Sequence, residues 1–247
     1  MIRLSRRSFA CVGWLAAALL LSAAALPVDA QHPKSSARAT AAVDRVKETE
    51  PVKTYGTRTA PILMEVYSDF QCPSCRGLYE QTLRQLINDY VASGKVFLVH
   101  RDFPLPVHPY SFVAARYANA AARIGKFAEV EAALYDNQAA WSVDGSLQKY
   151  VSAALSVSEM KHVQSLVDKC GGGSTAAARP ARLSTNAQGA EGCVLDSAIE
   201  KDVMLGRAVP VQQTPTSIVT YKSQHYPVIG IVSYPILKGF FDQLLRQ

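Results

Sequence analysis

Hydrophobic residues follow two different spacings in the first half of the chain. The runs Ile62–Tyr67 and Val96–Val99 are short and mainly apolar, which is typical of buried strands. Between them, apolar residues recur with a helical period at Tyr79, Leu83, Leu86, Ile87 and Tyr90. This helix is expected to begin near Cys75. The order strand, helix, strand predicts two parallel strands joined by a right-handed crossover.

The pattern changes to helices alone between Ser111 and about Leu205. Phe127, Val130, Leu134 and Trp141 are expected to share one helical stripe, and Ser146 and Ser158 are expected to cap two later helices. A polar, Gly-rich stretch, residues 171–192, interrupts this block and is expected to lack fixed structure.

Strand character returns near the C-terminus. Ser217–Tyr221 and a segment near Tyr226–Ile229 have strand patterns, and an amphipathic helix is predicted from about Tyr234. Two strands with a helix therefore precede the helical block, and two strands with a helix follow it. This order predicts an α/β domain with a helical insertion.

The first thirty residues, 1–30, have the pattern of a cleaved export signal. Three arginines precede the apolar run Cys11–Leu26, and Val28-Asp29-Ala30 resembles a cleavage site. The run is shorter than the roughly 20 residues that span a bilayer, so an uncleaved anchor is the less favoured alternative. Paired arginines also leave a twin-arginine route open. The polar residues 31–51 are expected to form a flexible tether.

The segment Cys72-Pro73-Ser74-Cys75 lies where the first strand gives way to the first helix. A C-x-x-C at such a turn is typical of a thiol-disulfide redox site. Cysteines three residues apart lie on one helix face and can close a disulfide ring. The helix N-terminus favours a thiolate at Cys72, which lowers its pKa. Cys75, one turn further on, is expected to be more buried.

A second pair of cysteines, Cys170 and Cys193, flanks the Gly-rich stretch. Two buried core thiols are one interpretation, since a free cysteine behaves as a small hydrophobic residue. A structural disulfide is favoured, because an even number of cysteines in an exported protein indicates disulfides. On the loop-entropy model it would stabilise the fold by about 3 kcal/mol. A second redox pair is the remaining alternative.

Net charge and histidine content give no support to nucleic-acid binding or metal binding. The net charge is +6, but no dense basic tract with interleaved aromatic residues supports nucleic-acid binding. The five histidines are scattered without metal-ligand spacing, and there is one C-x-x-C, so no metal site is expected. His108 is expected near the rim of the redox site but receives no role.

Three motifs together resemble those of the DsbA-like thiol-disulfide oxidoreductases of the bacterial cell envelope. They are the segment Ser68–Cys75, the segment Arg101–Leu105 and Thr214-Pro215-Thr216, in the order in which the family has them. The resemblance covers about residues 52–247. It implies a thioredoxin fold with residues 52–110 as its first half, residues 111–205 as a helical insertion and residues 206–247 as its second half.

The resemblance also implies roles for single residues. Cys72 would be the nucleophile that meets the partner, and Cys75 would resolve the mixed disulfide. Pro215 matches the cis-proline of the family, which would place the Thr214 backbone beside the site to pair with an extended substrate segment. Glu65 would relay protons to Cys75, since burial raises the pKa of a carboxyl group. An outward-facing strand residue is an equal alternative for Glu65.

The implied function is exchange of disulfides with cysteine-containing exported proteins in the periplasm, without a cofactor and with reoxidation by a membrane partner. Pro73 and Ser74 would tune the site. Strongly oxidising members carry histidine in place of Ser74, and Thr214 is more usual in reductases and isomerases, so a reductase or isomerase stays open. A Cys-based metal carrier and a non-catalytic peptide-binding domain are less favoured.

Overall fold

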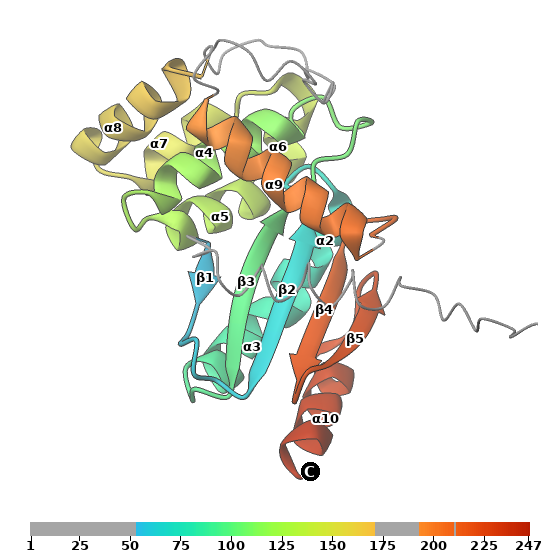
Figure 1. The fold of residues 1–247 in the computed structure, drawn as a ribbon. Coiled ribbons are helices and arrows are strands. Elements are labelled where there is room, and N and C mark those ends of the chain that lie inside the picture. The colour runs from blue at the N-terminus through green and yellow to red at the C-terminus, as the bar shows by residue number, and fades with distance from the viewer. Residues whose placement is uncertain (1–52, 171–192, 210) are drawn as a thin grey trace, which may run out of the picture. The chain divides into compact units, whose positions relative to one another are not determined.

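The computed structural model describes residues 53–170, 193–209 and 211–247. Its centre is a five-stranded sheet in the order β1-β3-β2-β4-β5 (Figure 1). β2 and β3 are parallel, and the other neighbouring pairs are antiparallel. The strands are β1 (Thr54–Tyr55), β2 (Ile62–Ser68), β3 (Val96–Asp102), β4 (Thr216–Tyr221) and β5 (Gln224–Ile229). The predicted export signal, tether and Gly-rich loop lie outside the described residues.

The predicted strand, helix, strand unit is confirmed, with the parallel pairing of β2 and β3. The helix begins at Pro73 rather than near Cys75, because proline at the first helical position loses no hydrogen bond. The segments α2 (Pro73–Leu78), η1 (Tyr79–Leu83), α3 (Arg84–Leu86) and η2 (Ile87–Val91) follow one another without a break, and η1 and η2 are π-helical.

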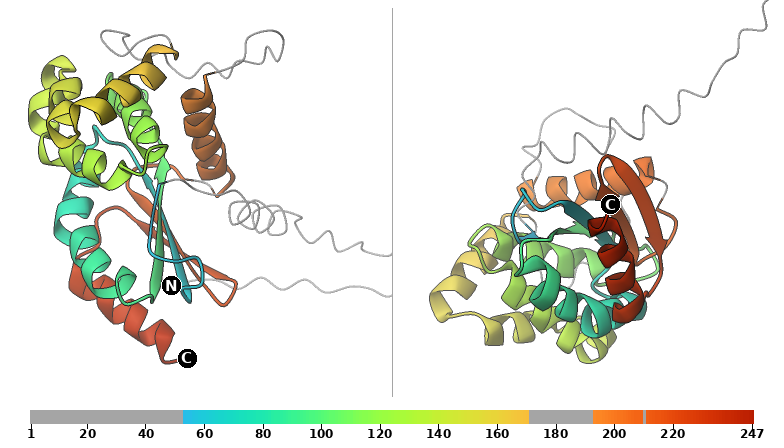
Figure 2. Two further views of the ribbon diagram at one scale, coloured as in Figure 1. Left: turned by 90° about the vertical axis from the view of Figure 1, so that its left-hand side faces the viewer. Right: turned by 90° about the horizontal axis from the view of Figure 1, so that it is seen from below.

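Among the described residues, six helices lie between β3 and β4, and α10 (Tyr234–Leu245) follows β5. They are α4 (Ser111–Ala122), α5 (Phe127–Asp136), α6 (Gln138–Asp144), α7 (Leu147–Ala154), α8 (Val157–Asp168) and α9 (Val194–Ala208). Helices α4 to α8 gather at one end of the sheet, whereas α9 lies along one of its faces (Figure 1). Helices α2, α3 and α10 cover the opposite face, as Figure 2 shows from a second direction. None of the described helices has both the length and the hydrophobicity to cross a bilayer.

Two details of the insertion differ from the prediction. The expected stripe from Phe127 to Trp141 is divided at Asn137 into α5 and α6. Ser158 does not cap α8. Ser156 does, because its hydroxyl accepts the N–H of Glu159 while the Glu159 carboxylate accepts the N–H of Ser156, which is a capping box.

Buried charges attach α9 to the sheet. Asp202 of α9 lies 3.0 Å from the Arg101 guanidinium and 2.7 Å from the Lys53 ammonium, and it accepts the N–H of Asp102 at 3.1 Å. Lys53 also pairs with the Asp102 carboxylate. Removing one partner of a buried ion pair leaves an uncompensated charge. Separation of α9 from the sheet is therefore energetically unfavourable.

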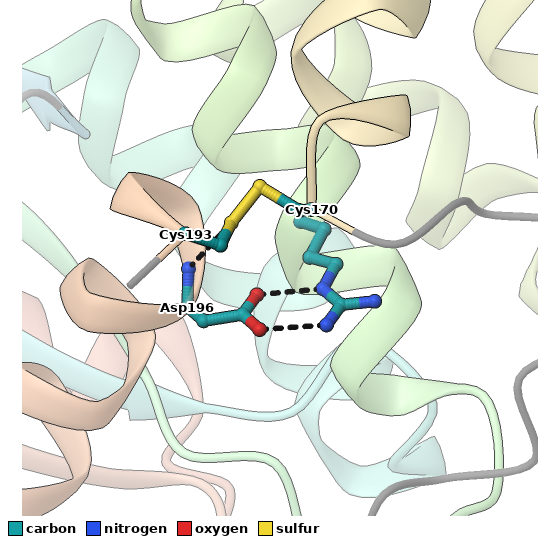
Figure 3. The surroundings of a disulfide bond; sticks show 4 residues. Cys170, Cys193 and Asp196 are labelled. Carbon is teal, nitrogen blue, oxygen red and sulfur yellow. Dashed lines mark hydrogen bonds and ion pairs between the residues drawn. A yellow bond between two sulfur atoms is a disulfide. The ribbon is translucent and has the colours of Figure 1, made fainter. Parts of the chain in front are cut away.

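The first turn of α9 is joined to the rest of the insertion by a disulfide and an ion pair (Figure 3). Cys170 and Cys193 are disulfide-bonded, which is the pairing that the sequence favours, and a structural role for this bond stays a prediction. Asp196 accepts two hydrogen bonds from Arg116 of α4, at 2.6 and 2.7 Å. Further along α9, Gly206 lies against Phe103 of the β3–α4 loop, where a Cβ atom would come within 2.7 Å of the aromatic ring.

Candidate active site

Cys72 and Cys75 occupy the first turn of α2 as free thiols. Cys72 is the N-cap residue, and its carbonyl accepts the N–H groups of Cys75 and Arg76 at 3.1 and 3.2 Å. The exposed fraction is 7 % for Cys72 and 1 % for Cys75. Cys72 is therefore the more exposed of the two cysteines and Cys75 the more buried one, as the sequence predicts.

The pKa values of the two thiols are shifted in opposite directions. The hydrogen bond with the Cys75 side chain lowers the pKa of Cys72 to about 5, with further contributions from Thr214 and from the N–H groups of Cys75 and Ser74. Burial raises the pKa of Cys75 well above its ordinary value, and the neighbouring Cys72 raises it further. At neutral pH the pair therefore holds one proton, on Cys75.

The loop before β4 completes the site. The Thr214–Pro215 peptide bond is cis, which confirms the conformation expected for Pro215. The Cys72 sulfur lies 3.5 Å from the Thr214 carbonyl oxygen, and the Pro215 carbonyl accepts the N–H of Gly230 at 2.8 Å. The Thr214 hydroxyl is buried and has no hydrogen-bond partner among the described residues. Fold topology thus brings two segments 142 positions apart into contact.

Glu65 does not lie beneath Cys75. Successive strand residues point to opposite faces, and Met64 and Val66 belong to the core cluster that contains both cysteines. Glu65 therefore faces the other side of β2, where it is 1 % exposed and accepts two hydrogen bonds from Arg101 at 3.0 and 2.8 Å. The expected proton relay to Cys75 lacks a geometric basis. The residue is not a solvent-facing strand residue either.

Other polar groups contact Cys75. Its sulfur accepts the backbone N–H of Asp69 at 3.4 Å, and the Ser68 side chain lowers the pKa of the thiol against the larger effect of burial. The Ser68 and Tyr135 hydroxyl oxygens lie 2.7 Å apart in the core. Ser68 and Asp69 belong to the motif that surrounds the cysteines, but no role for either residue follows from the sequence.

Asp69 is a buried hub of the site. Its carboxylate accepts the backbone N–H groups of Gln71 at 2.7 Å and Leu105 at 2.8 Å, and it lies 2.7 Å from Nδ1 of His108. The His108 side chain is 20 % exposed, whereas that of Asp69 is fully buried. The Asp69 hydrogen bond raises the pKa of His108 against the effect of burial. His108 is therefore tied to the active-site turn.

Two glutamines connect the insertion to the same turn. Gln138 of α6 donates to the carbonyl oxygens of Phe70 and Cys72 at 2.7 and 3.0 Å. Gln71 accepts the N–H of Tyr110 at 2.7 Å and donates to the Ser142 carbonyl at 3.2 Å. Neutral amides have no recognisable motif, so neither glutamine could be identified from the sequence.

The described residues contain one group of three side chains close enough to hold a metal ion: Cys170, Cys193 and Asp196. Both sulfurs of this group form the disulfide, and the carboxylate binds Arg116. Cys72 and Cys75 belong to no such group within the described parts of the chain.

A model of the thioredoxin family matches residues 47–227. The chain belongs to this family.

Several solved structures share the fold of this thioredoxin-family protein. The thiol-disulfide exchange protein alpha-DsbA2 from Wolbachia pipientis has a TM-score of 0.60 and 18% identity, with 85% of this chain and 97% of that chain covered. Oxidised BdbD from Bacillus subtilis has a TM-score of 0.59 and 18% identity, with 78% and 92% covered. A periplasmic thioredoxin-like protein from Salmonella enterica serovar Typhimurium has a TM-score of 0.52 and 18% identity, with 83% and 97% covered. The predicted DsbA-like fold with a helical insertion is confirmed.

A curated relative matches over a shorter segment. The Na(+)/H(+) antiporter NhaA 3 from Salinispora tropica is 43% identical over 84 residues, which cover 34% of this chain and 12% of the antiporter. The thioredoxin-family chain therefore corresponds to a small part of that protein.

Proposed function

We propose that this thioredoxin-family protein is an exported thiol-disulfide oxidoreductase that exchanges disulfides with cysteines of cell-envelope or secreted proteins. The observation that carries the proposal is the opposite shift in the pKa values of Cys72 and Cys75, beside the cis-proline loop. An accessible thiolate with a buried, protonated neighbour suits thiol-disulfide exchange. The signal-like N-terminal pattern supports export, and one structural neighbour is described as periplasmic.

In the oxidising direction, a substrate thiolate attacks the Cys72 sulfur of the Cys72–Cys75 disulfide. The internal S–S bond breaks, a bond between the substrate sulfur and Cys72 forms, and Cys75 leaves as a thiolate that takes up a proton because its pKa is high. A second substrate thiolate then attacks the first substrate sulfur and releases Cys72 as a thiolate. Two electrons pass from the substrate dithiol to the enzyme, which needs no cofactor for this exchange.

The low pKa of Cys72 supports this direction. A stable thiolate is a good leaving group and stabilises the reduced enzyme, which makes the disulfide more oxidising. A value of about 5 lies between the values of about 7 for thioredoxin and about 3.5 for DsbA. The reverse direction, a reductase or isomerase, is the second candidate, because neither Pro73 nor Ser74 supplies a positive charge.

Substrate binding is assigned to the loop that contains Thr214 and Pro215, with Pro73 and Ser74 on the facing turn. The Thr214 carbonyl lies beside Cys72, and the Thr214 hydroxyl has no hydrogen-bond partner within the described parts of the chain, so both groups are open to an extended substrate segment. Reoxidation after each cycle requires an electron acceptor. A membrane redox partner is the acceptor that the DsbA-like resemblance supports.

The deciding experiment is the reduction potential of the Cys72–Cys75 pair, measured in glutathione buffers on the chain that begins near Gln31. A potential of about −120 to −180 mV would make the protein a donor of disulfides to exported substrates. A potential of about −270 mV would make it a reductant that needs an electron supply. N-terminal sequencing of the protein from its own cells tests export, since cleavage near Gln31 is expected.

A further inference from the structure

The Cys72 thiolate has no cationic neighbour within its own motif. Pro73 and Ser74, the residues between the cysteines, are both uncharged. The loop between β3 and α4 supplies an ionisable side chain instead. His108 of this loop lies against the turn that precedes α2 through its contact with Asp69.

The carboxylate of Asp69 fixes both the ring and the loop that carries it. One oxygen, Oδ2, lies 2.7 Å from the ring nitrogen of His108 and accepts the N–H of Leu105 at 2.8 Å. The backbone of Asp69 contacts the redox pair, since its N–H donates to the Cys75 sulfur at 3.4 Å and its carbonyl accepts the N–H of Cys72 at 3.1 Å. A single buried residue therefore holds the His108 ring in register with both cysteines.

We propose that Asp69 holds His108 as the positive charge that favours the thiolate form of Cys72. His108 is a positioning residue, because it acts through space on Cys72 and takes no part in bond making. The proposal rests on the proposed function only in treating Cys72 as the reactive thiolate. It assigns to a loop histidine the charge that the residues between the cysteines do not provide.

The charges around the ring agree with this assignment. Two groups that titrate act on His108, namely Asp69 from the turn before α2 and Cys72 at the start of α2, and both raise the pKa of the imidazole. Cys72 is faced in turn by Cys75 and Thr214. When Cys72 enters a disulfide, its negative charge disappears, and Asp69 remains as the acidic group that raises the pKa of His108. Since coupling between two sites is reciprocal, oxidation must lower the proton affinity of His108.

The first test measures this reciprocity without any substitution. The ring signals of His108 are followed by NMR against pH in the reduced and the oxidised protein, with His162 of α8 as the internal control. We expect a higher pKa for His108 in the reduced protein than in the oxidised protein, and ring signals of His162 that do not differ between the two states. Equal values for His108 in both states would overturn the proposal.

The second test compares His108→Gln with the matched control His162→Gln, an exposed histidine of α8. Thiolate absorbance near 240 nm against pH reports the Cys72 titration, and glutathione equilibration reports the potential. An opposite charge near a thiolate shifts its ionisation, so we expect His108→Gln to weaken thiolate formation about three- to tenfold. A tenfold change makes the potential about 30 mV more reducing.

An unchanged Cys72 titration in a folded His108→Gln variant would contradict the proposal. These readouts are independent of substrate turnover. An absence of turnover in the unsubstituted protein, together with the expected titration shifts, would therefore reject the proposed function and leave the assignment of His108 standing.

Discussion

Gln138 of helix α6 donates its side-chain N–H to the backbone carbonyl of Cys72 at 3.0 Å. The same amide nitrogen donates to the carbonyl of Phe70 at 2.7 Å. The turn that carries Cys72 is thus held by a residue of the helical insertion. The insertion is part of the active-site architecture as well as a lateral addition to the thioredoxin fold.

Replacing Gln138 by Leu should destabilise this turn. Two buried carbonyls would lose a donor, which costs about 1–3 kcal/mol of unfolding free energy. Urea unfolding measures the loss, and the rate of Cys72 alkylation reports whether the turn is disturbed. Gln243→Leu, at an exposed position of α10, is the control and should change neither quantity. Equal stability of the two variants would show that the Gln138 contacts are dispensable.

Reduced protein should become less stable relative to oxidised protein as the pH falls. The pKa of Cys72 is about 5 in the folded protein, and its ordinary value is 9.0. The thiolate therefore stabilises the fold in full above about pH 9, and this stabilisation is lost as the pH falls towards 5. The pKa of Cys75 is raised, so its contribution to the stability of the fold is present at low and neutral pH and is lost only at high pH. Disulfide-bonded cysteines do not titrate.

The difference in unfolding free energy, reduced minus oxidised, should therefore fall between about pH 8 and about pH 5, by up to about 1.4 kcal/mol per pH unit. Denaturant titrations of both forms at several pH values measure it. The Cys72→Ser variant under reducing conditions supplies the baseline without the thiolate. Parallel stability curves for the two redox forms would contradict the assigned titration of Cys72.

Glu65→Gln should affect stability and leave turnover unchanged. Glu65 is buried beside Arg101 on the sheet face away from Cys75, so loss of its charge weakens a buried ion pair at a cost of about 3 kcal/mol. Glu80→Gln, in the exposed pair with Arg76, is the matched control and should cost almost nothing. Slow turnover in a variant of normal stability would restore the proton-relay role.

Replacing Cys170 and Cys193 together by Ser should lower the unfolding free energy by about 3 kcal/mol, because the unfolded chain regains the entropy of the closed loop. The Cys72 titration should not change, since neither residue contacts the active-site turn through a described hydrogen bond. Thermal unfolding and thiolate absorbance measure the two effects. A shifted Cys72 titration would point to the second redox pair that the sequence left open.

Single substitutions in the redox pair separate exchange chemistry from binding. Cys75→Ser should accumulate mixed disulfides with substrates, because Cys72 can attack but nothing resolves the product. Cys72→Ser should accumulate none, and non-reducing gels with mass spectrometry distinguish the two. Retention of a peptide by Cys72→Ser, with no exchange in the unsubstituted protein, would favour the binding-domain alternative, whereas a metal ion that the unsubstituted protein binds and Cys72→Ser loses would favour the Cys-based carrier.

The sequence predicted those features that depend on local pattern. Strand β2 and the order of elements follow from residue spacing, and the cis bond at Pro215 followed from the family resemblance. Ser156 was also within reach, because Glu159 stands three residues after it, whereas Ser158 is followed at that distance by Lys161.

Features that depend on long-range contact could not be predicted in this way. The role of Glu65 depends on which face of β2 each residue occupies, and residues of both parities along β2 are buried, so hydropathy did not distinguish the faces. The contact between Asp69 and His108 joins positions 39 apart through a loop without periodic structure. The stripe through Asn137 continued in phase on both sides of the break, which concealed the division of α5 from α6.

The contact between Cys72 and Thr214 has a consequence for biogenesis. The two residues are 142 positions apart, so Cys72 is synthesised long before the loop that lies beside it. Until that loop arrives, Cys72 lacks the Thr214 contribution to its lowered pKa. The nascent chain therefore has a less reactive thiol at this position than the finished protein. High reactivity is acquired only in the finished fold, which shields the growing polypeptide from premature cross-linking by its own active site.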